Sequence, residues 1–223
     1  YKKFYEDLGK VTIQNFKMIG GSGVDEKEFP FTKPLKKGKI EIVYTGRILK
    51  DKGVIDLIKA MKLLDDESKK DIVLKLYGTI DIKNPAHIKE EELKSQLIRG
   101  FIKWEGFTSE VKRILESADI YCLPSYREGL PKSSIEAMAI GRPIITTNVP
   151  GCEDTVQDGY NGYKIEAGDV EALSKKLNEL IKNKQLRIQM GENSRKLFLR
   201  NFTLEKVISQ IVESYNSVLS ITC

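Results

Sequence analysis

The chain has 223 residues, of which 40% are hydrophobic and 31% are charged, and its formal net charge is +5. This composition is typical of an ordinary soluble globular protein of one large domain or slightly more. No apolar run approaches the roughly 18–20 residues that a membrane-spanning helix requires. The three cysteines lie far apart without metal-type spacing, and their odd number favours a reducing compartment.

The chain begins at Tyr1, and no charged and then apolar signal segment follows. We therefore interpret it as a fragment or a processed form, whose start says nothing about targeting. In line with the reducing compartment that the cysteines favour, we expect it in the cytoplasm, with peripheral contact at the inner face of the membrane left open. A cluster of lysines would suit anionic lipid or nucleic acid, but a solvated loop is the favoured interpretation, and we expect no nucleic-acid partner. These lysines are Lys33, Lys36, Lys37 and Lys39.

Strand-like and helix-like segments alternate through most of the chain. The run "KIEIVYTG" (39–46) is β-rich and ends in glycine, and "KGVIDLIKAMKLL" (52–64) places apolar residues on one helical face. This spacing predicts βαβ units, and therefore an α/β fold with a parallel sheet covered by helices on both faces. The further elements expected are a strand at 71–78, a helix at 87–99, a strand at 101–106, a helix at 109–118 capped by Ser109, a strand at 119–125, a helix from Pro131, and strands at 143–148 and 162–167.

After residue 168 the pattern becomes wholly helical. Asp169 is the expected N-cap of one helix, a second follows at about 185–199, and 203–219 carries an apolar stripe. The beginning of the chain is irregular apart from one strand-like run at 11–20. We therefore divide the chain into an irregular N-terminal segment at 1–38, a sheet domain at 39–202 and a C-terminal helix at 203–223.

The turns that follow the predicted strands are the candidate binding sites, because ligands of parallel sheets bind at the carboxyl ends of strands. Several of these turns carry a glycine, at Gly46, Gly78, Gly106 and Gly129. The last belongs to "YREGLPKSSIEAMAIGRPIITT", in which Pro131 fits the first position of a helix, where its missing N–H is unsatisfied anyway.

This helix start has the features of an anion site. The free amides of Lys132 and Ser133, together with the helix dipole, favour phosphate, and Gly129 allows close approach to the backbone. Two carboxylates, Glu128 and Glu136, flank the same place. Carboxylates suit a phosphate site when they accept hydrogen bonds from hydroxyls of the same ligand, as in a nucleotide sugar. A capped helix with two surface glutamates is the competing interpretation.

A second candidate is "YTGRILKDKG" (44–53), where Arg47 follows a strand end and Lys52 opens the next helix. Two cations at one strand end would neutralise a diphosphate, which Arg47 can bind bidentately. The sequence contains no phosphate-binding P-loop, no Gly-x-Ser-x-Gly elbow and no metal cluster. The single histidine, His87, lies in a polar stretch, which argues against histidine-based catalysis.

Taken together, "GSGVD", "YTGRILKDKG", "EGF" and "ADIYCLPSYREGLPKSSIEAMAIGRPIITT" resemble the C-terminal half of GT-B-fold retaining glycosyltransferases with a Glu-x7-Glu motif. Within that family, the stretch around Glu128 is similar to bacterial enzymes that build lipid-linked glycans, capsule and O-antigen. The resemblance runs from about residue 11 to the end. It implies a Rossmann-like domain, one half of a GT-B fold, and a last helix at 203–219 that crosses back to the other half and leaves its apolar stripe uncovered here.

The resemblance also implies roles for individual residues. Arg47 and Lys52 would bind the donor diphosphate, Glu128 the hydroxyls of the donor sugar, and Glu136 the ribose. The loop at 102–108 would hold the base. The catalytic set implied is Glu128, Arg47 and Lys52, and the donor-binding set is Arg47, Lys52, Gly78, Gly106, Phe107, Glu128, Gly129, Leu130, Pro131, Lys132 and Glu136, with no metal and no cofactor.

The expected function is therefore that of a donor domain. It would bind a nucleotide sugar, with UDP preferred on family grounds, for transfer of a hexose or N-acetylhexosamine to a glycan or polyprenyl-linked acceptor. The acceptor domain has no counterpart in the sequence, so we expect the chain alone to be inactive. The alternatives left open are a nucleotide-sugar epimerase or a glycogen-type phosphorylase on the same fold, and a non-catalytic donor-binding subunit.

Overall fold

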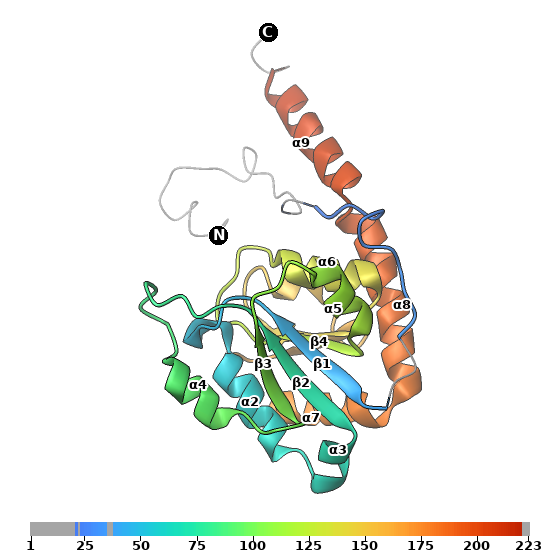
Figure 1. The fold of residues 1–223 in the computed structure, drawn as a ribbon. Helices are drawn as coiled ribbons and strands as arrows, with labels where there is room; N and C mark the ends of the chain where they lie inside the picture. The colour runs from blue at the N-terminus through green and yellow to red at the C-terminus, as the bar shows by residue number, and fades with distance from the viewer. Residues whose placement is uncertain (1–20, 22, 35–37, 220–223) are drawn as a thin grey trace.

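The computed structural model describes residues 21, 23–34 and 38–219, and its centre is a six-stranded sheet in which neighbouring strands are parallel (Figure 1). The strand order is β3-β2-β1-β4-β5-β6. The strand expected at 11–20 lies outside the described residues. The six strands are β1 (Ile40–Thr45), β2 (Ile72–Tyr77), β3 (Ile102–Gly106), β4 (Ile120–Leu123), β5 (Ile144–Thr147) and β6 (Gly162–Ile165).

Helices cover both faces of the sheet, as the alternating pattern predicts (Figure 1). Helix α2 packs on α7 on one face, and α6 packs on α5 and α8 on the other. The α-helices are α2 (Val54–Leu63), α3 (Asp66–Lys70), α4 (Glu90–Gln96), α5 (Val111–Ser117), α6 (Lys132–Ile140), α7 (Val170–Lys182), α8 (Lys184–Asn201) and α9 (Leu204–Leu219), and two short 3-10 helices are η2 (Lys50–Lys52) and η3 (Glu153–Thr155).

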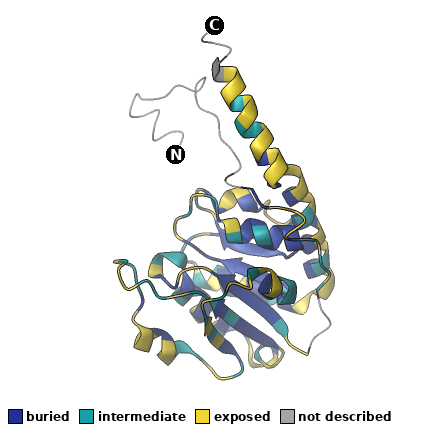
Figure 2. Cartoon of the chain, turned by 45° about the horizontal axis from the view of Figure 1, so that its top comes forward, coloured by how far each residue is buried: buried dark blue, intermediate teal, exposed yellow. Residues whose placement is uncertain are grey.

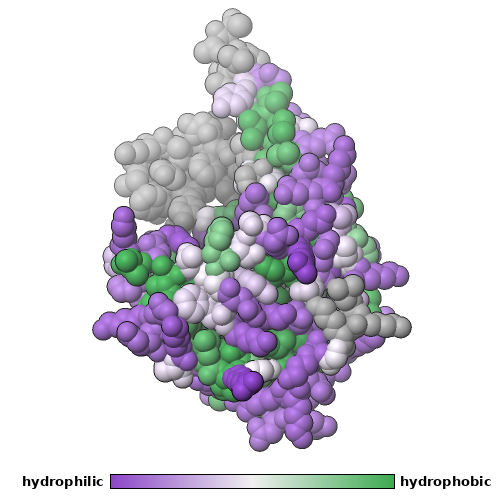
Figure 3. Space-filling model, in the orientation of Figure 1, coloured by the Kyte–Doolittle hydropathy of each residue, from purple (hydrophilic) through white to green (hydrophobic). Residues whose placement is uncertain are grey.

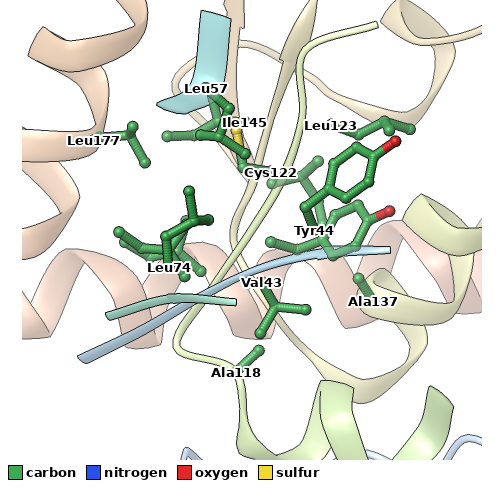
Figure 4. Packing of buried hydrophobic residues seen from close by; sticks show 14 of the residues in the cluster. Val43, Tyr44, Leu57, Leu74, Ala118, Cys122, Leu123, Ala137, Ile145 and Leu177 are labelled. Carbon is green, nitrogen blue, oxygen red and sulfur yellow. The ribbon is translucent and has the colours of Figure 1, made fainter. Parts of the chain in front are cut away.

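The central strands are buried on both faces, which is why they read as nearly continuous apolar runs (Figure 2). All residues of β4 and β5 are buried, including Cys122 at the middle of the core. Figure 4 shows Leu57 of α2 and Leu177 of α7 on one side of the strands and Ala137 of α6 on the other. A rigid sheet therefore supports the loops at its carboxyl edge.

Two expected helix starts are wrong in detail, and one is confirmed. Glu110, not Ser109, is the N-cap of α5, and its amide donates to Thr108 Oγ1 at 2.9 Å. Pro131 is the N-cap of α6 in an extended conformation, one position before the first helical residue. Asp169 caps α7 as predicted, because its Oδ1 accepts a hydrogen bond from the amide of Ala172 at 2.8 Å.

The segment around Val24, which precedes the sheet, lies beside the start of the last helix, α9. Val24 pairs with Thr203 in a parallel bridge, and the amide of Leu204 donates to Val24 O at 2.9 Å. From there α9 projects away from the body (Figures 1 and 2), and an apolar strip runs along it (Figure 3). The exposed apolar side chains of α9 are Leu204, Ile208, Val212 and Tyr215, whereas Val207 is buried. Within the described part of the chain, no helix combines the length and apolar character needed to cross a membrane.

Candidate functional site

The sheet has a topological switch point between β1 and β4. The chain leaves β1 towards β2 on one side and leaves β4 towards β5 on the other, although β1 and β4 are paired neighbours. Loops that leave adjacent strands in opposite directions open a crevice at their carboxyl ends, where α/β proteins bind ligands. The loop after β1 carries Arg47 and Lys52, and the loop after β4 carries Glu128 and leads into α6.

Two hollows lie at this edge of the sheet. The first has a volume of about 310 Å³ and the second of about 220 Å³, and they share Thr45, Gly46 and Arg47 as a common wall. Together they form an elongated groove across the ends of β1, β2 and β4. The first is lined by Thr45, Gly46, Arg47, Lys52, Leu123, Glu128, Leu130, Pro131, Lys132 and Ser133, and the second by Thr45, Gly46, Arg47, Tyr77, Gly78, Thr79, Phe107, Thr108 and Val111.

Each cation of the groove has a carboxylate partner. Lys52 Nζ lies 2.7 Å from Glu128 Oε1 and donates to Arg127 O at 3.2 Å, and the Lys52 and Glu128 side chains are largely buried. Arg47 Nη1 lies 3.2 Å from Asp81 Oδ2 at a more exposed position. The sequence predicted the cations but not these pairs, because Asp81 lies in the long loop between β2 and α4, which carries no motif.

The N-terminus of α6 points its free amides towards the first hollow, which Pro131, Lys132 and Ser133 line. No side chain caps this helix, so the positive end of its dipole is available to an anion. The amide of Ser134 already donates to Pro131 O at 3.1 Å. The uncapped helix start on which the expected anion site depends is therefore present, although Pro131 stands at the N-cap rather than at the first helical position.

Glu136 lies on the second turn of α6, with its side chain only 12% exposed. Burial raises its pKa above the usual range of a glutamate, and the Lys132 ammonium, 3.7 Å from Oε1, opposes that shift. A partly desolvated carboxylate gains from an additional hydrogen-bond donor, such as a hydroxyl group.

Backbone contacts explain two glycines beside the groove. A Cβ at Gly53 would lie 2.0 Å from Pro124 O, and one at Gly151 would lie 1.9 Å from Gly129 O. Both glycines have positive φ, so both backbone conformation and contact require them. By contrast, a Cβ at Gly129 would meet nothing within 4 Å, so its backbone faces open space. The loops that carry the charged residues are thus pressed against their neighbours.

Most of the predicted site residues lie at this one edge, but not all of them line the groove. Gly106, Gly129 and Glu136 are not among the residues that line the two hollows, whereas Phe107 lines the second one with 76% of its surface exposed. Sequence reasoning missed Thr45 and Tyr121, whose hydroxyls lie 3.2 Å apart beneath the groove. Within the part of the chain that the structure describes, no group of three His, Cys, Asp or Glu side chains could hold a metal ion.

The family model for glycosyl transferases group 1 matches residues 25–197, which includes every element of the sheet and both loops of the groove. The chain belongs to this glycosyl transferase family. The expectation of a Rossmann-like half of a GT-B fold is confirmed as well, because the six-stranded sheet and its helices match those of GT-B glycosyltransferases.

Two curated relatives show the size of proteins in this glycosyl transferase family. The chain is 32% identical over 178 residues to the capsular polysaccharide biosynthesis glycosyltransferase CapM of Staphylococcus aureus, covering 80% of the chain and 46% of CapM. It is 31% identical over 170 residues to the N,N'-diacetylbacillosaminyl-diphospho-undecaprenol alpha-1,3-N-acetylgalactosaminyltransferase of Campylobacter jejuni, covering 76% of the chain and 43% of that enzyme. The chain thus spans about half the length of the curated relatives it matches.

A solved structure of similar fold is that of Anabaena HepE in complex with UDP and glucose. The TM-score is 0.76 at 20% sequence identity, over 87% of this chain and 55% of HepE. At this identity the similarity supports the fold of the chain.

Proposed function

We propose that this chain is the donor domain of a retaining glycosyltransferase and that its groove binds a nucleotide-diphospho-sugar, with UDP as the nucleotide. The observation that carries the proposal is the first hollow, where Arg47, Lys52 and the uncapped N-terminus of α6 surround one space of about 310 Å³. Two side-chain cations and a helix dipole directed at one space suit a diphosphate.

The remaining features of the groove fit the other parts of such a donor. The second hollow, walled by Phe107 and Tyr77, offers apolar surface for a base, and Arg47 stands between the two spaces. Glu136 accepts hydrogen bonds from the ribose in this proposal, and Glu128 from the hydroxyls of a hexose or N-acetylhexosamine. UDP is favoured over other nucleotides because HepE, which shares the fold, was solved with UDP.

The proposed chemistry is electrostatic. As the bond between the sugar and the diphosphate breaks, negative charge grows on the leaving diphosphate, and Arg47, Lys52 and the α6 amides stabilise it. Cationic side chains then perform the work that a divalent metal performs in other transferases, so the proposed reaction is metal-independent. Glu128, paired with Lys52 at 2.7 Å, orients the sugar and is not proposed as a nucleophile.

The acceptor side of the reaction is proposed from the relatives. The chain covers less than half of the Campylobacter enzyme, whose name specifies a diphospho-undecaprenol acceptor. We infer that a glycan or polyprenyl-linked acceptor binds to a further domain of the kind that makes up the other half of these relatives. The exposed apolar side chains of α9 support such a neighbour, because side chains such as Ile208 and Val212 are each 50% exposed on one helix face.

The decisive experiment measures UDP binding by calorimetry with Arg47 and Lys52 both replaced by Ala. Loss of two charge-assisted contacts is expected to weaken binding by about 2–4 kcal/mol. The matched control replaces Lys94 and Lys182 by Ala, since both lysines form exposed ion pairs away from the groove. Unchanged UDP affinity in the Arg47/Lys52 variant would place the phosphates elsewhere and end the proposal.

A further inference from the structure

A buried hydroxyl connects the two walls of the first hollow. Tyr121 lies on β4 and is fully buried, yet its phenol oxygen lies 2.7 Å from Ser133 Oγ, 3.2 Å from Thr45 Oγ1 and 3.3 Å from Thr45 O. Thr45 is the last residue of β1, and Ser133 lies in the first turn of α6. Both also line the hollow, so Tyr121 supports the site from below without lining it.

The proton count sets the direction of this chain of hydroxyls. A phenol has one proton, and the contact with Ser133 Oγ is the shortest of the three, so Tyr121 donates to Ser133. Thr45 Oγ1 then donates to the phenol oxygen of Tyr121. Because Ser133 Oγ accepts from Tyr121, its own proton is left for another acceptor. Within the described part of the chain, the Ser133 hydroxyl makes no other hydrogen bond.

The environment keeps the phenol in its donating form. Burial raises the pKa of Tyr121 well above the usual range, and the negative charges of Glu136 and Glu128 add to the rise, against the opposing hydrogen bonds to Ser133 and Thr45. The phenol is therefore protonated at neutral pH. Hydrogen bonds that follow one another in a low-dielectric interior polarise each other, which strengthens the last donor in the chain.

We propose that Tyr121 is a positioning residue of this site: it fixes the Ser133 hydroxyl so that Ser133 donates its proton into the hollow, to a phosphate oxygen of the donor. The inference rests on the proposed function, because it takes the anion in the hollow to be the diphosphate. It adds a contact that the motif around Glu128 does not reveal, since Tyr121 lies in the preceding buried strand. Phenylalanine would fill the same buried space, so packing does not account for the hydroxyl group of Tyr121. The proposal gives that hydroxyl group a role.

The test compares UDP with uridine, which lacks the phosphates. In the Tyr121→Phe variant the dissociation constant of UDP should rise about three- to tenfold, the effect of one oriented hydrogen bond, while that of uridine stays unchanged. Ser133→Ala should cause a loss of similar size. If Tyr121 acts through Ser133, the double variant should bind UDP no more weakly than either single variant.

Tyr163→Phe is the matched control, because this phenol is also buried and hydrogen-bonded, to Glu179 of α7, and Tyr163 is not among the residues that line the groove. It should leave the binding of UDP and uridine unchanged. Equal losses for UDP and uridine in Tyr121→Phe, additive losses in the double variant, or no loss would each overturn the inference. If the Arg47/Lys52 variant loses UDP while Tyr121→Phe does not, the proposed function stands and only the role of Tyr121 fails.

Discussion

Lys52 and Glu128 are 76 positions apart in the sequence, yet both line the first hollow and their side chains form an ion pair of 2.7 Å. Their side chains are only 14% and 18% exposed, so the pair is shielded from water on most sides. A cation proposed to bind phosphate and a carboxylate proposed to bind sugar therefore share one contact. Any anion that reaches Lys52 competes with Glu128 for it.

This pair leads to a prediction that separates the two glutamates. Glu128→Gln should not weaken UDP, because it removes the competitor for Lys52, but it should weaken a UDP-sugar relative to UDP. Glu136→Gln should weaken UDP itself, because its proposed partner is the ribose. Calorimetry with UDP and a UDP-sugar measures both effects. Equal loss of UDP in the two variants would show that the assigned roles are wrong.

Glu136 also makes stability depend on pH. Burial raises its pKa in the folded state, so folding favours the protonated form. The contribution of Glu136 to stability is therefore fully present below the pKa of the unfolded chain, at about 4.3, and is lost as pH rises through the higher pKa of the folded state. Glutamine mimics the protonated form at every pH.

We therefore expect Glu136→Gln to raise the melting temperature at pH 7 and to have little effect at about pH 4. Thermal melts of both proteins across this range measure the difference. A Glu136→Gln variant that is less stable than the wild type at pH 7 would contradict the assignment, because it would mean that the charged form is favoured by folding.

The glycines beside the groove offer a prediction with a closely matched control. Gly151→Ala introduces a Cβ 1.9 Å from Gly129 O, whereas Gly159→Ala introduces one with nothing within 4 Å. Both positions have positive φ, so both variants carry a backbone penalty of about 1 kcal/mol, and their difference reports the contact alone. Gly151→Ala should lose clearly more stability in urea and should also weaken a UDP-sugar relative to UDP, because Gly129 adjoins Glu128. An equal loss of stability in the two variants would mean that the loop around Gly151 accommodates the added Cβ at no energetic cost.

The sequence predicted the sheet well because buried parallel strands have a local signature. The run at 39–46 and the observed β1 at Ile40–Thr45 differ by one residue at each end. Arg47 and Lys52 could be brought to the same edge as Glu128 because parallel strands all end there. The ion partners could not be predicted in this way. Asp81 reaches Arg47 only through the path of a long loop, and the Tyr121 hydroxyl finds Thr45 and Ser133 only through the packing of β1, β4 and α6.

The transfer reaction itself is expected to require a second domain. Transfer requires an acceptor oxygen held beside the anomeric carbon with bulk water excluded. The chain spans about half the length of its curated relatives, so we expect the elements that complete such a site to lie in a further domain. We expect residues 1–223 alone to bind the donor and at most to hydrolyse it slowly. A transfer assay should become positive when a domain matching the other half of the relatives is supplied, fused or in trans.

The apolar strip of α9 decides whether that domain docks where we expect. Replacing Ile208 and Val212 together by Glu should leave the melting temperature of the chain nearly unchanged, because both side chains are half-exposed already. The same change should abolish the restored transfer, since two charges would be buried without partners at the new interface. Ser209→Glu, also at an exposed position of α9, is the control and should retain transfer. Efficient transfer by the 223-residue chain alone would refute the requirement for a second domain, and restored transfer by the Ile208/Val212 variant would move the docking face away from α9.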